Sequence, residues 1–325
     1  MTQEEAEKRI KELCQYPIPD GFLEAEERNG YLVSAKMKRV WAVQLELLKK
    51  LLEVCQKHNL RIWADGGTLI GAVREHGYIP WDDDIDMRML RPDYDKLVSI
   101  AQQEFNHPYF FQCGYTEKYY SRGHVQLRMD GTSAMAAHPS LLGIHHGIFI
   151  DIFPLDAVPD DGQMLMKHIE KLKQLQNKIM QSWCFDILHP IRSLTLIKYR
   201  NNTGKLHSEF ENHLRKYSIN DCKNVSCLSF STDIEHYMND KHWYDETLYL
   251  PFEYIMMPVP SGYDEILTKL FGDYMKPVQE ASCHGEFWKF DAETDYRDCL
   301  PEFEKVCKVK KRQWYKQRLL KMLKK

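Results

Sequence analysis

Several features that mark specialised protein classes are missing from this sequence. No run approaches the roughly eighteen apolar residues that a membrane-spanning helix needs, and the start, MTQEEAEKRIKEL, is too polar and acidic for a signal peptide. Internal repeats and low-complexity segments are also absent. With 325 residues, 43% of them hydrophobic and 28% charged, the chain is expected to be a globular cytoplasmic protein that buries a sizeable core.

Closely paired cysteines are missing as well. The nine cysteines form no CxxC pair and their number is odd, so we expect reduced, mostly structural thiols rather than disulfides or a zinc site. Zinc would be sought at only two places, Cys283-His284 and the pair Cys222 and Cys227.

An excess of positive charge is missing from most of the chain. Ten Lys or Arg and no acid lie between Lys305 and Lys325, so the net charge of −3 for the whole chain leaves −13 on residues 1–304. Such an acidic body argues against nucleic acid as the main substrate.

A paired glycine turn is present in the stretch from Trp63 to Tyr94, which reads WADGGTLIGAVREHGYIPWDDDIDMRMLRPDY. Gly66, Gly67 and Thr68 follow a short apolar run and are predicted to open a helix, with Thr68 as its cap. Free backbone N–H groups at such a helix start suit a phosphate. A double glycine alone is most often only a turn, so its position between a strand and a helix carries the prediction.

An acidic ladder follows in the same stretch. Carboxylates two residues apart on a strand point to the same side, so Asp82, Asp84 and Asp86 are predicted to share one face of a strand. Three such charges repel one another unless a cation lies among them, and oxygen ligands suit Mg²⁺ or Mn²⁺. The alternative is a solvated acidic loop, but apolar residues surround the acids. The ladder therefore predicts metal-assisted chemistry on a phosphate ester.

A further carboxylate interrupts the apolar run GIFIDIFPLD at residues 147–156. A lone acid in a buried strand is costly unless it is paired or bound to a metal. Asp151 is therefore a candidate to complete the acidic site. Asp156 is a weaker candidate, because it can simply cap a turn.

Three arginines could meet an anionic substrate near these acids. Arg74 closes the helix after the glycine turn, and a contact with the helix dipole is the alternative reading of its position. Arg122 and Arg128 flank a predicted strand, where a solvated surface position is the alternative.

Three motifs in this order resemble the LicD family of phosphocholine transferases, whose core fukutin and fukutin-related protein share. They are DGGTLIGAVREHGYIPWDDDID, HGIFIDIFPLD and VPSGYDEILTKLFGDYMKP, and the similarity covers the chain from about Lys36 to His284. The resemblance implies an α+β fold of the nucleotidyltransferase type, a mixed β-sheet flanked by helices, with an additional mainly helical region.

The chain is predicted to have four segments. A helical extension at 1–35 precedes a nucleotidyltransferase-like core at 36–160. A helical and mixed region at 161–300 completes the same catalytic unit, and a basic tail follows at 301–325.

The resemblance also assigns roles by motif position. The matching residues are, for the donor phosphate, Gly66, Gly67 and Thr68, and, for the metal, Asp82, Asp84, Asp86 and Asp151. We add Arg74 and Arg128 as candidate donor contacts from their positions. Many relatives have a basic residue where Gln126 stands here, which puts a donor contact at that position in doubt.

The implied reaction is transfer of a phospho-alcohol from CDP-choline or another CDP-alcohol to a sugar hydroxyl of a cell-surface glycan, with release of CMP. Mg²⁺ or Mn²⁺ on the catalytic acids Asp84, Asp86 and Asp151 would neutralise the pyrophosphate. Asp151 could instead take the proton of the acceptor hydroxyl. Trp81, Tyr263 and Tyr274 could form an aromatic cage around choline, although most aromatic residues will be core.

Two other functions fit the same motifs. One is transfer of the nucleotide itself with release of pyrophosphate, and the other is an inactive module that binds divalent metal or nucleotide. The motifs do not distinguish choline from ethanolamine, glycerol or ribitol, nor do they give the acceptor sugar or the oligomeric state.

The basic tail, KVCKVKKRQWYKQRLLKMLKK, is predicted to form a helix with its apolar residues on one side. Such helices often lie on anionic membranes, which would place the protein peripherally at the inner membrane face, near a lipid-linked acceptor. A solvated tail is the alternative. Because eukaryotic relatives usually have a Golgi membrane anchor, the lack of an apolar span favours decoration of bacterial polysaccharide, lipopolysaccharide or teichoic acid.

Overall fold

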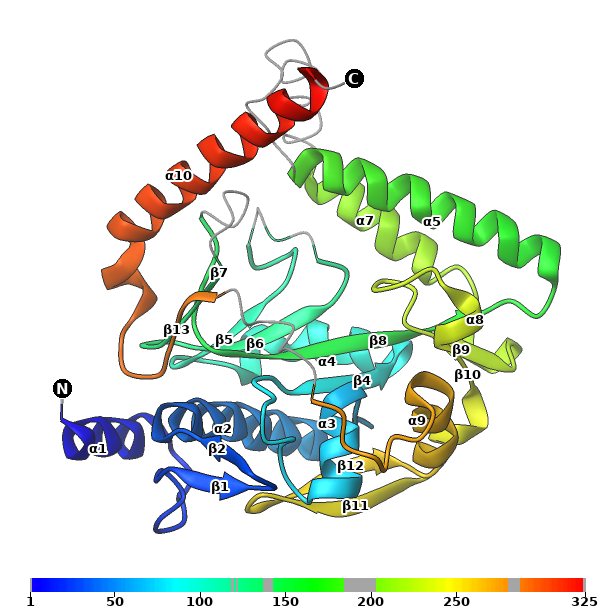
Figure 1. The fold of residues 1–325 in the computed structure, drawn as a ribbon. Helices are drawn as coiled ribbons and strands as arrows, with labels where there is room; N and C mark the ends of the chain where they lie inside the picture. Colours follow the sequence, from blue (N-terminus) through cyan, green and yellow to red (C-terminus); the bar gives the residue numbers. More distant parts are fainter. Residues whose placement is uncertain are drawn as a thin grey trace.

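The centre of the fold is one long strand, β8 (Phe149–Val158), in which every residue is buried. The computed structural model describes residues 2–117, 120, 122–136, 143–183, 203–279 and 287–323. A strand whose two faces are both covered needs apolar residues at successive positions, as β8 has around its two acids, Asp151 and Asp156. Figure 1 shows β8 running through the middle of the molecule.

Seven described strands, of which β8 is one, form a mixed sheet. Along one edge, β8 pairs in parallel with β4 (Asp86–Leu90), which pairs with the short β3 (Trp63–Ala64). Along its other edge, the first half of β8 pairs antiparallel with β6 and its end pairs antiparallel with β9. The bounds of the strands on this side are β5 (Tyr109–Gln112), β6 (Val125–Met129), β9 (Asn224–Ser226) and β10 (Met238–Asp240).

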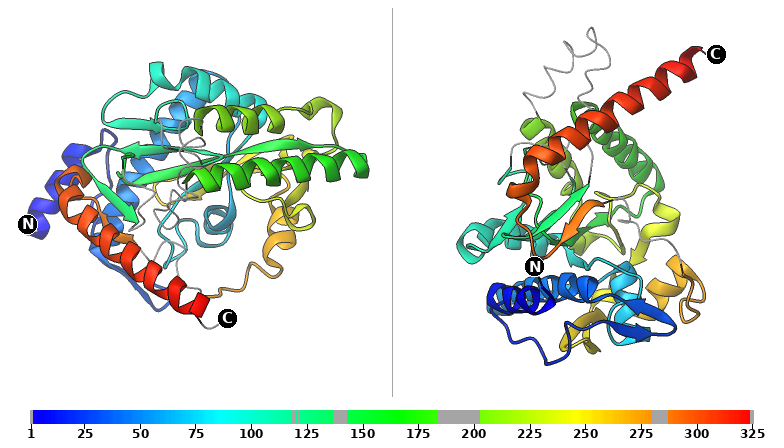
Figure 2. Two further views of the ribbon diagram at one scale, coloured as in Figure 1. Left: turned by 90° about the horizontal axis from the view of Figure 1, so that it is seen from above. Right: turned by 60° about the vertical axis from the view of Figure 1, so that its left-hand side comes forward.

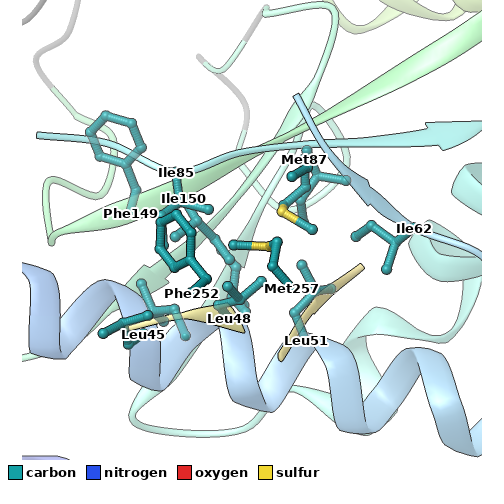
Figure 3. Packing of buried hydrophobic residues seen from close by; sticks show 14 of the residues in the cluster. Leu45, Leu48, Leu51, Ile62, Ile85, Met87, Phe149, Ile150, Phe252 and Met257 are labelled. Carbon is teal, nitrogen blue, oxygen red and sulfur yellow. The ribbon is translucent and has the colours of Figure 1, made fainter. Parts of the chain in front are cut away.

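Helix α2 (Ala35–Lys57) covers one face of this sheet. Ser34 caps its start by accepting a hydrogen bond from the N–H of Met37 (3.2 Å). Figure 3 shows Leu48 of α2 among strand residues and Met257 of a neighbouring hairpin. Full burial of a leucine contributes about 1.5–3 kcal/mol, so replacing Leu48 with alanine would cost about 2–5 kcal/mol.

The hairpin that contains Met257, formed by β11 and β12, belongs to the elements that surround the sheet on the α2 side. Their bounds are α1 (Gln3–Leu13), β1 (Glu26–Arg28), β2 (Tyr31–Val33), α3 (Gly66–Ile70), a π-helical turn η1 (Gly71–Glu75), α4 (Arg91–Glu104), β11 (Thr247–Phe252), β12 (Ile255–Pro260) and α9 (Tyr263–Phe271). Together with the sheet they enclose the main hydrophobic core.

Further helices lie across the sheet from α2 (Figures 1 and 2). The bounds of the remaining elements are β7 (Ser133–Ala136), α5 (Gly162–Trp183), α7 (Thr203–Leu214), η3 (Ile219–Asp221), α8 (Ile234–Tyr237), η4 (Lys241–Tyr244), β13 (Phe287–Asp291) and α10 (Tyr296–Leu323). Helices α5 and α7 share a small separate core, and β7 pairs with β13. Figure 2 shows α10 projecting beyond the rest of the fold.

The predicted α+β class, a mixed sheet flanked by helices with a further helical region, is confirmed. The predicted helix of the basic tail is confirmed as α10, but the side chains from residue 314 onward, which would form its apolar side, lie outside the described part. The segment predicted as a helical extension, residues 1–35, contains helix α1 and also the hairpin β1–β2. The four-segment division stays a prediction.

Two predictions made from absences can be compared with the structure. Among the described helices, none has the length and apolar character needed to cross a membrane. Cys222 and Cys227 are free thiols, while Cys283-His284 lies outside the described residues.

Candidate functional site

Two acids stand opposite each other where β4 and β8 meet. Asp86 pairs with Asp151 in the parallel register of these strands. The N–H of Asp86 donates to Oγ1 of Thr68 (2.9 Å), and the N–H of Asp151 donates to the carbonyl of Ile85 (2.9 Å). The start of α3 and the two strands are therefore tied together at this point.

The predicted acidic strand is wrong in its extent, because β4 begins only at Asp86. Asp82 and Asp84 lie in the preceding loop, where carboxylate oxygens of Asp82, Asp83 and Asp84 lie within 4.8 Å of one another. The loop backbone turns toward α2 instead of pairing with β8. The acids thus come together through a loop and a strand rather than along one strand face.

Helix α2 holds this loop through two side chains. The indole N–H of Trp41 donates to the carbonyl of Asp82 (3.0 Å), and Nε2 of Gln44 donates to the carbonyl of Asp83 (2.8 Å). The ring of Tyr78 stacks on Trp41 at 4.3 Å, and its hydroxyl donates to Oε1 of Gln44 (3.1 Å). The buried positions of α2 that suggested only core packing therefore also place the acids.

The glycines leave room for the acids. A Cβ on Gly67 would lie 2.6 Å from Oδ2 of Asp82, and a Cβ on Gly66 would lie 3.8 Å from Oδ2 of Asp86. The helix begins at Gly66 after Asp65, so the prediction that Thr68 caps it is wrong. Thr68 instead holds the N–H of Asp86.

Burial and mutual repulsion govern the charge of the acids. Burial, Asp84 and Asp83 raise the pKa of Asp82 well above its usual value. Burial, and after it the carboxylates of Asp84 and Asp151, raise the pKa of Asp86. A cation among these oxygens would remove the repulsion.

Asp151 has a different environment. Burial alone would raise its pKa, but His124, with smaller contributions from Arg122 and Gln126, lowers it below its usual value. Nε2 of His124 lies 3.0 Å from Oδ1 of Asp151, yet the two atoms are not aligned for a hydrogen bond. Asp151 therefore keeps a charged oxygen available at the site.

This donor set fits a hard divalent cation. Its oxygens come from carboxylates, the ligands that Mg²⁺ and Mn²⁺ prefer. The loop supplies Asp82 and Asp84, and the strands supply Asp86 and Asp151, whose charges act on one another. The metal ligands themselves stay a prediction.

Two predicted donor contacts, Arg128 and Arg74, bond to other residues of the protein. Arg128 is buried and donates to Oε1 of Gln112 (2.5 Å), the carbonyl of Gly147 (2.6 Å) and Oε1 of Gln126 (2.6 Å). Burial, followed by the charge of Arg122, lowers the pKa of Arg128 to about 10. These partners tie Arg128 to Gln126, and the charge of Asp151 also acts on Arg128. The contact of Arg128 with the donor stays a prediction.

Arg74 closes the π-helical turn, where it makes structural contacts. Its Nε lies 2.6 Å from Oε1 of Glu75, and Nη1 donates to the carbonyl of Tyr274 (2.5 Å). Arg122 is half-buried and acts on the pKa of Asp151, which makes it the better placed cation of the three predicted.

The three residues of the predicted aromatic cage have contacts with other residues. Trp81 meets Tyr31 edge-on at 6.0 Å, and Tyr263 packs against the main core. The hydroxyl of Tyr274 donates to Asp264 (2.6 Å). None of the three predicted residues lines the cavity beside Asp86.

Sequence reasoning missed His124, Trp41 and Gln44. Trp41 and Gln44 looked like ordinary positions of a core-packing helix. His124 lies just before β6, and only the antiparallel pairing of β6 with β8 brings it to Asp151.

The fold defines the class of α+β proteins with a mixed sheet flanked by helices. The family model described as LicD/FKTN/FKRP, nucleotidyltransferase domain, matches residues 59–203, which include the glycine turn and all four predicted metal ligands. This chain therefore carries a LicD-family nucleotidyltransferase domain, which confirms the resemblance seen in its motifs.

Curated proteins are similar to the chain over different lengths. The lipopolysaccharide cholinephosphotransferase LicD of Haemophilus influenzae is 28% identical over 245 residues, which cover 73% of this chain and 91% of that protein. Uncharacterized proteins of Rickettsia prowazekii and Rickettsia typhi are each 38% identical, over 98 and 104 residues, or 33% and 32% of their lengths.

Proposed function

We propose that this protein is a metal-dependent phosphotransferase that moves phosphocholine, or a related phospho-alcohol, from a CDP-activated donor to a sugar hydroxyl of a cell-surface glycan. The leaving group is CMP. The similarity to the Haemophilus influenzae cholinephosphotransferase over 91% of that protein supports the reaction class and a glycan acceptor. The gathering of Asp82, Asp84, Asp86 and Asp151 in the LicD-family domain is the observation that carries the proposal.

The four acids would hold Mg²⁺ or Mn²⁺. When bound there, the cation supplies positive charge that neutralises the pyrophosphate and the departing CMP. Asp151 has a lowered pKa, so it is a weak base, and this favours a role as cation ligand over one as proton acceptor. His124, 3.0 Å from Asp151, would orient that carboxylate.

The phosphate of the donor would lie at the start of α3. Gly66 and Gly67 keep space open beside Asp86 and Asp82, and backbone N–H groups at a helix start attract phosphate. Arg122 would contribute the nearby positive charge.

Calorimetric titration with CDP-choline, CDP-ethanolamine, CDP-glycerol and CDP-ribitol, with Mg²⁺ and with EDTA, tests the proposal. We expect one donor to bind only with Mg²⁺, and Asp84→Asn to abolish that binding. Asp95→Asn is the matched control, because Asp95 pairs with Arg215 (2.7 Å) outside the site.

Three results would overturn the proposal. Binding of a nucleoside triphosphate but of no CDP-alcohol, with pyrophosphate as product, would support nucleotidyl transfer. Unchanged donor binding in EDTA would exclude a metal requirement. Unchanged activity in Asp84→Asn would support an inactive binding module.

The acceptor would be an oligosaccharide or a lipid-linked glycan. Helix α10 carries Lys305, Lys308 and Lys310, and a basic helix is attracted to anionic lipid. Peripheral membrane contact predicts sedimentation with vesicles containing phosphatidylglycerol but not with phosphatidylcholine vesicles. Equal behaviour with the two vesicles would contradict it.

A further inference from the structure

A cavity of about 160 Å³ opens beside the acids. Its lining includes Asp65, Gly66, Asp86 and Arg88, together with Cys227, His236 and Leu270. Four aromatic residues also line it, and we call their part of the cavity the aromatic pocket: Phe153, Phe230, Tyr237 and Phe271.

The rings come from separate parts of the chain. Phe153 belongs to β8, Tyr237 ends α8, Phe271 ends α9 and Phe230 lies between β9 and α8. Phe230 meets Phe153 edge-on at 5.7 Å and Tyr237 edge-on at 6.1 Å. In such T-shaped contacts the planes of neighbouring rings lie nearly perpendicular to each other.

Two of the rings are unusually open to solvent. Phe230 is 59% exposed and Phe271 is 50% exposed. Large apolar side chains that gather at a surface cavity are typical of binding sites. Phe153, by contrast, is buried and touches His124 with ring centroids 4.3 Å apart. His124 in turn contacts Asp151, so the pocket adjoins the acidic site.

The aromatic faces of the pocket favour a quaternary ammonium. Oδ2 of Asp65 lies 2.5 Å from Nε of Arg88, so the charge of Arg88 is paired. Asp86 also lines the pocket, and its charge belongs to the proposed metal site. Aromatic faces attract a quaternary ammonium, which needs no hydrogen-bond partner.

The size of the pocket favours a small group. Sites for drug-sized ligands have about 300–1,000 Å³, well above the 160 Å³ present here. The pocket therefore suits part of a donor molecule rather than a whole nucleotide.

We propose that the aromatic pocket binds the methylated ammonium head of the donor alcohol and so selects choline over glycerol and ribitol. This inference rests on the proposed function, because it places the alcohol beside the acids that act on its phosphate. The alternative occupant, the cytosine ring, is an outcome of the test below.

The test compares ligands that share one part of the donor. CDP-choline, CDP-glycerol and CMP are titrated, each with Mg²⁺, into the full-length protein and into Phe230→Leu, which keeps an apolar side chain but removes the ring. We expect the affinity for CDP-choline to fall roughly three- to thirtyfold, with CDP-glycerol and CMP unchanged. Leu248→Ala, at an exposed residue of β11 outside the pocket, is the control.

A second probe does not depend on the donor. Choline should displace bound CDP-choline more strongly than its neutral isostere 3,3-dimethylbutan-1-ol, and Phe271→Leu should reduce that difference. Equal displacement by the two compounds would contradict a cation site.

The other outcomes separate the two proposals. An equal loss of CDP-choline, CDP-glycerol and CMP affinity in Phe230→Leu would assign the pocket to the base. Unchanged CDP-choline affinity in both variants would remove the pocket from donor binding while leaving the transferase proposal intact. If the unmodified protein bound no CDP-alcohol, the transferase proposal itself would fail, and this inference with it.

Discussion

The two ends of strand β8 each bury an aspartate, but the neighbours of the two carboxylates differ. Oδ1 of Asp156 lies 2.6 Å from Nε of Arg91, and Arg91 also approaches Asp95 at 3.4 Å. At the other end, Asp151 faces Asp86 across the β4–β8 register, and other acids lie nearby.

The difference separates structural acids from functional ones. Removal of one partner from a buried charge pair destabilises the folded state, whereas clustered like charges destabilise it until a cation joins them. The acid at the Asp156 end is therefore assigned a structural role. At the Asp151 end, the carboxylates repel one another, and a bound metal would relieve that repulsion. Changes at the two ends should have opposite effects on activity and stability.

Asp86→Asn should have the largest effect on activity. It removes a carboxylate from the acidic site, so we expect CMP release from the donor to fall by at least about 100-fold. The free energy of unfolding of the metal-free protein should stay equal or rise, because repulsion from Asp84 and Asp151 is removed. Product chromatography and urea unfolding measure the two effects.

Asp156→Asn should have the largest effect on stability. It leaves Arg91 buried with only the more distant Asp95, and breaking a buried pair costs about 3–5 kcal/mol. Urea unfolding should show this loss, while the folded fraction still binds the donor. A loss of donor affinity without a loss of stability would reverse the roles assigned to the two ends.

The acids at the Asp151 end should also make stability depend on pH. Because the folded pKa values of Asp82 and Asp86 lie above their unfolded values, these two carboxyl groups hold more protons in the folded protein than in the unfolded chain. Their contribution to stability without metal should therefore fall as pH rises above 3.8, the ordinary value for aspartate.

Asp86→Asn isolates this dependence. Asp151 has a lowered pKa and loses its contribution only as pH falls, so it acts in the other direction. As pH rises, the free energy of unfolding of the unmodified protein should therefore fall relative to that of Asp86→Asn. Saturating Mg²⁺ should abolish the difference, and a difference that persists would contradict the assignment.

Trp41→Phe should have the smallest effect. It removes the hydrogen bond that holds the carbonyl of Asp82, which is worth about 1 kcal/mol, so donor affinity with Mg²⁺ should fall about fivefold. Trp63→Phe is the matched control, because its indole N–H donates to Oγ1 of Thr247 (2.8 Å) away from the loop. Equal loss in both variants would indicate a general packing effect.

The sequence predicted the fold class and the acids, because a double glycine and a run of aspartates are local signals. It did not predict how the acids meet. The bend at Asp82 depends on Trp41 and Gln44 of α2, and the place of His124 depends on strand pairing. Arg74 and Arg128 could not be judged from sequence, because their partners lie far along the chain or in a neighbouring strand.

The most direct test of a metal site at the Asp151 end is titration with Mn²⁺ of three proteins: the unmodified protein, Asp86→Asn and Asp95→Asn. Binding is measured by calorimetry and by the electron paramagnetic resonance signal of the free ion. The account predicts that the unmodified protein and Asp95→Asn bind Mn²⁺ with equal affinity and that Asp86→Asn loses this binding. Unchanged Mn²⁺ affinity in a folded Asp86→Asn protein would contradict it.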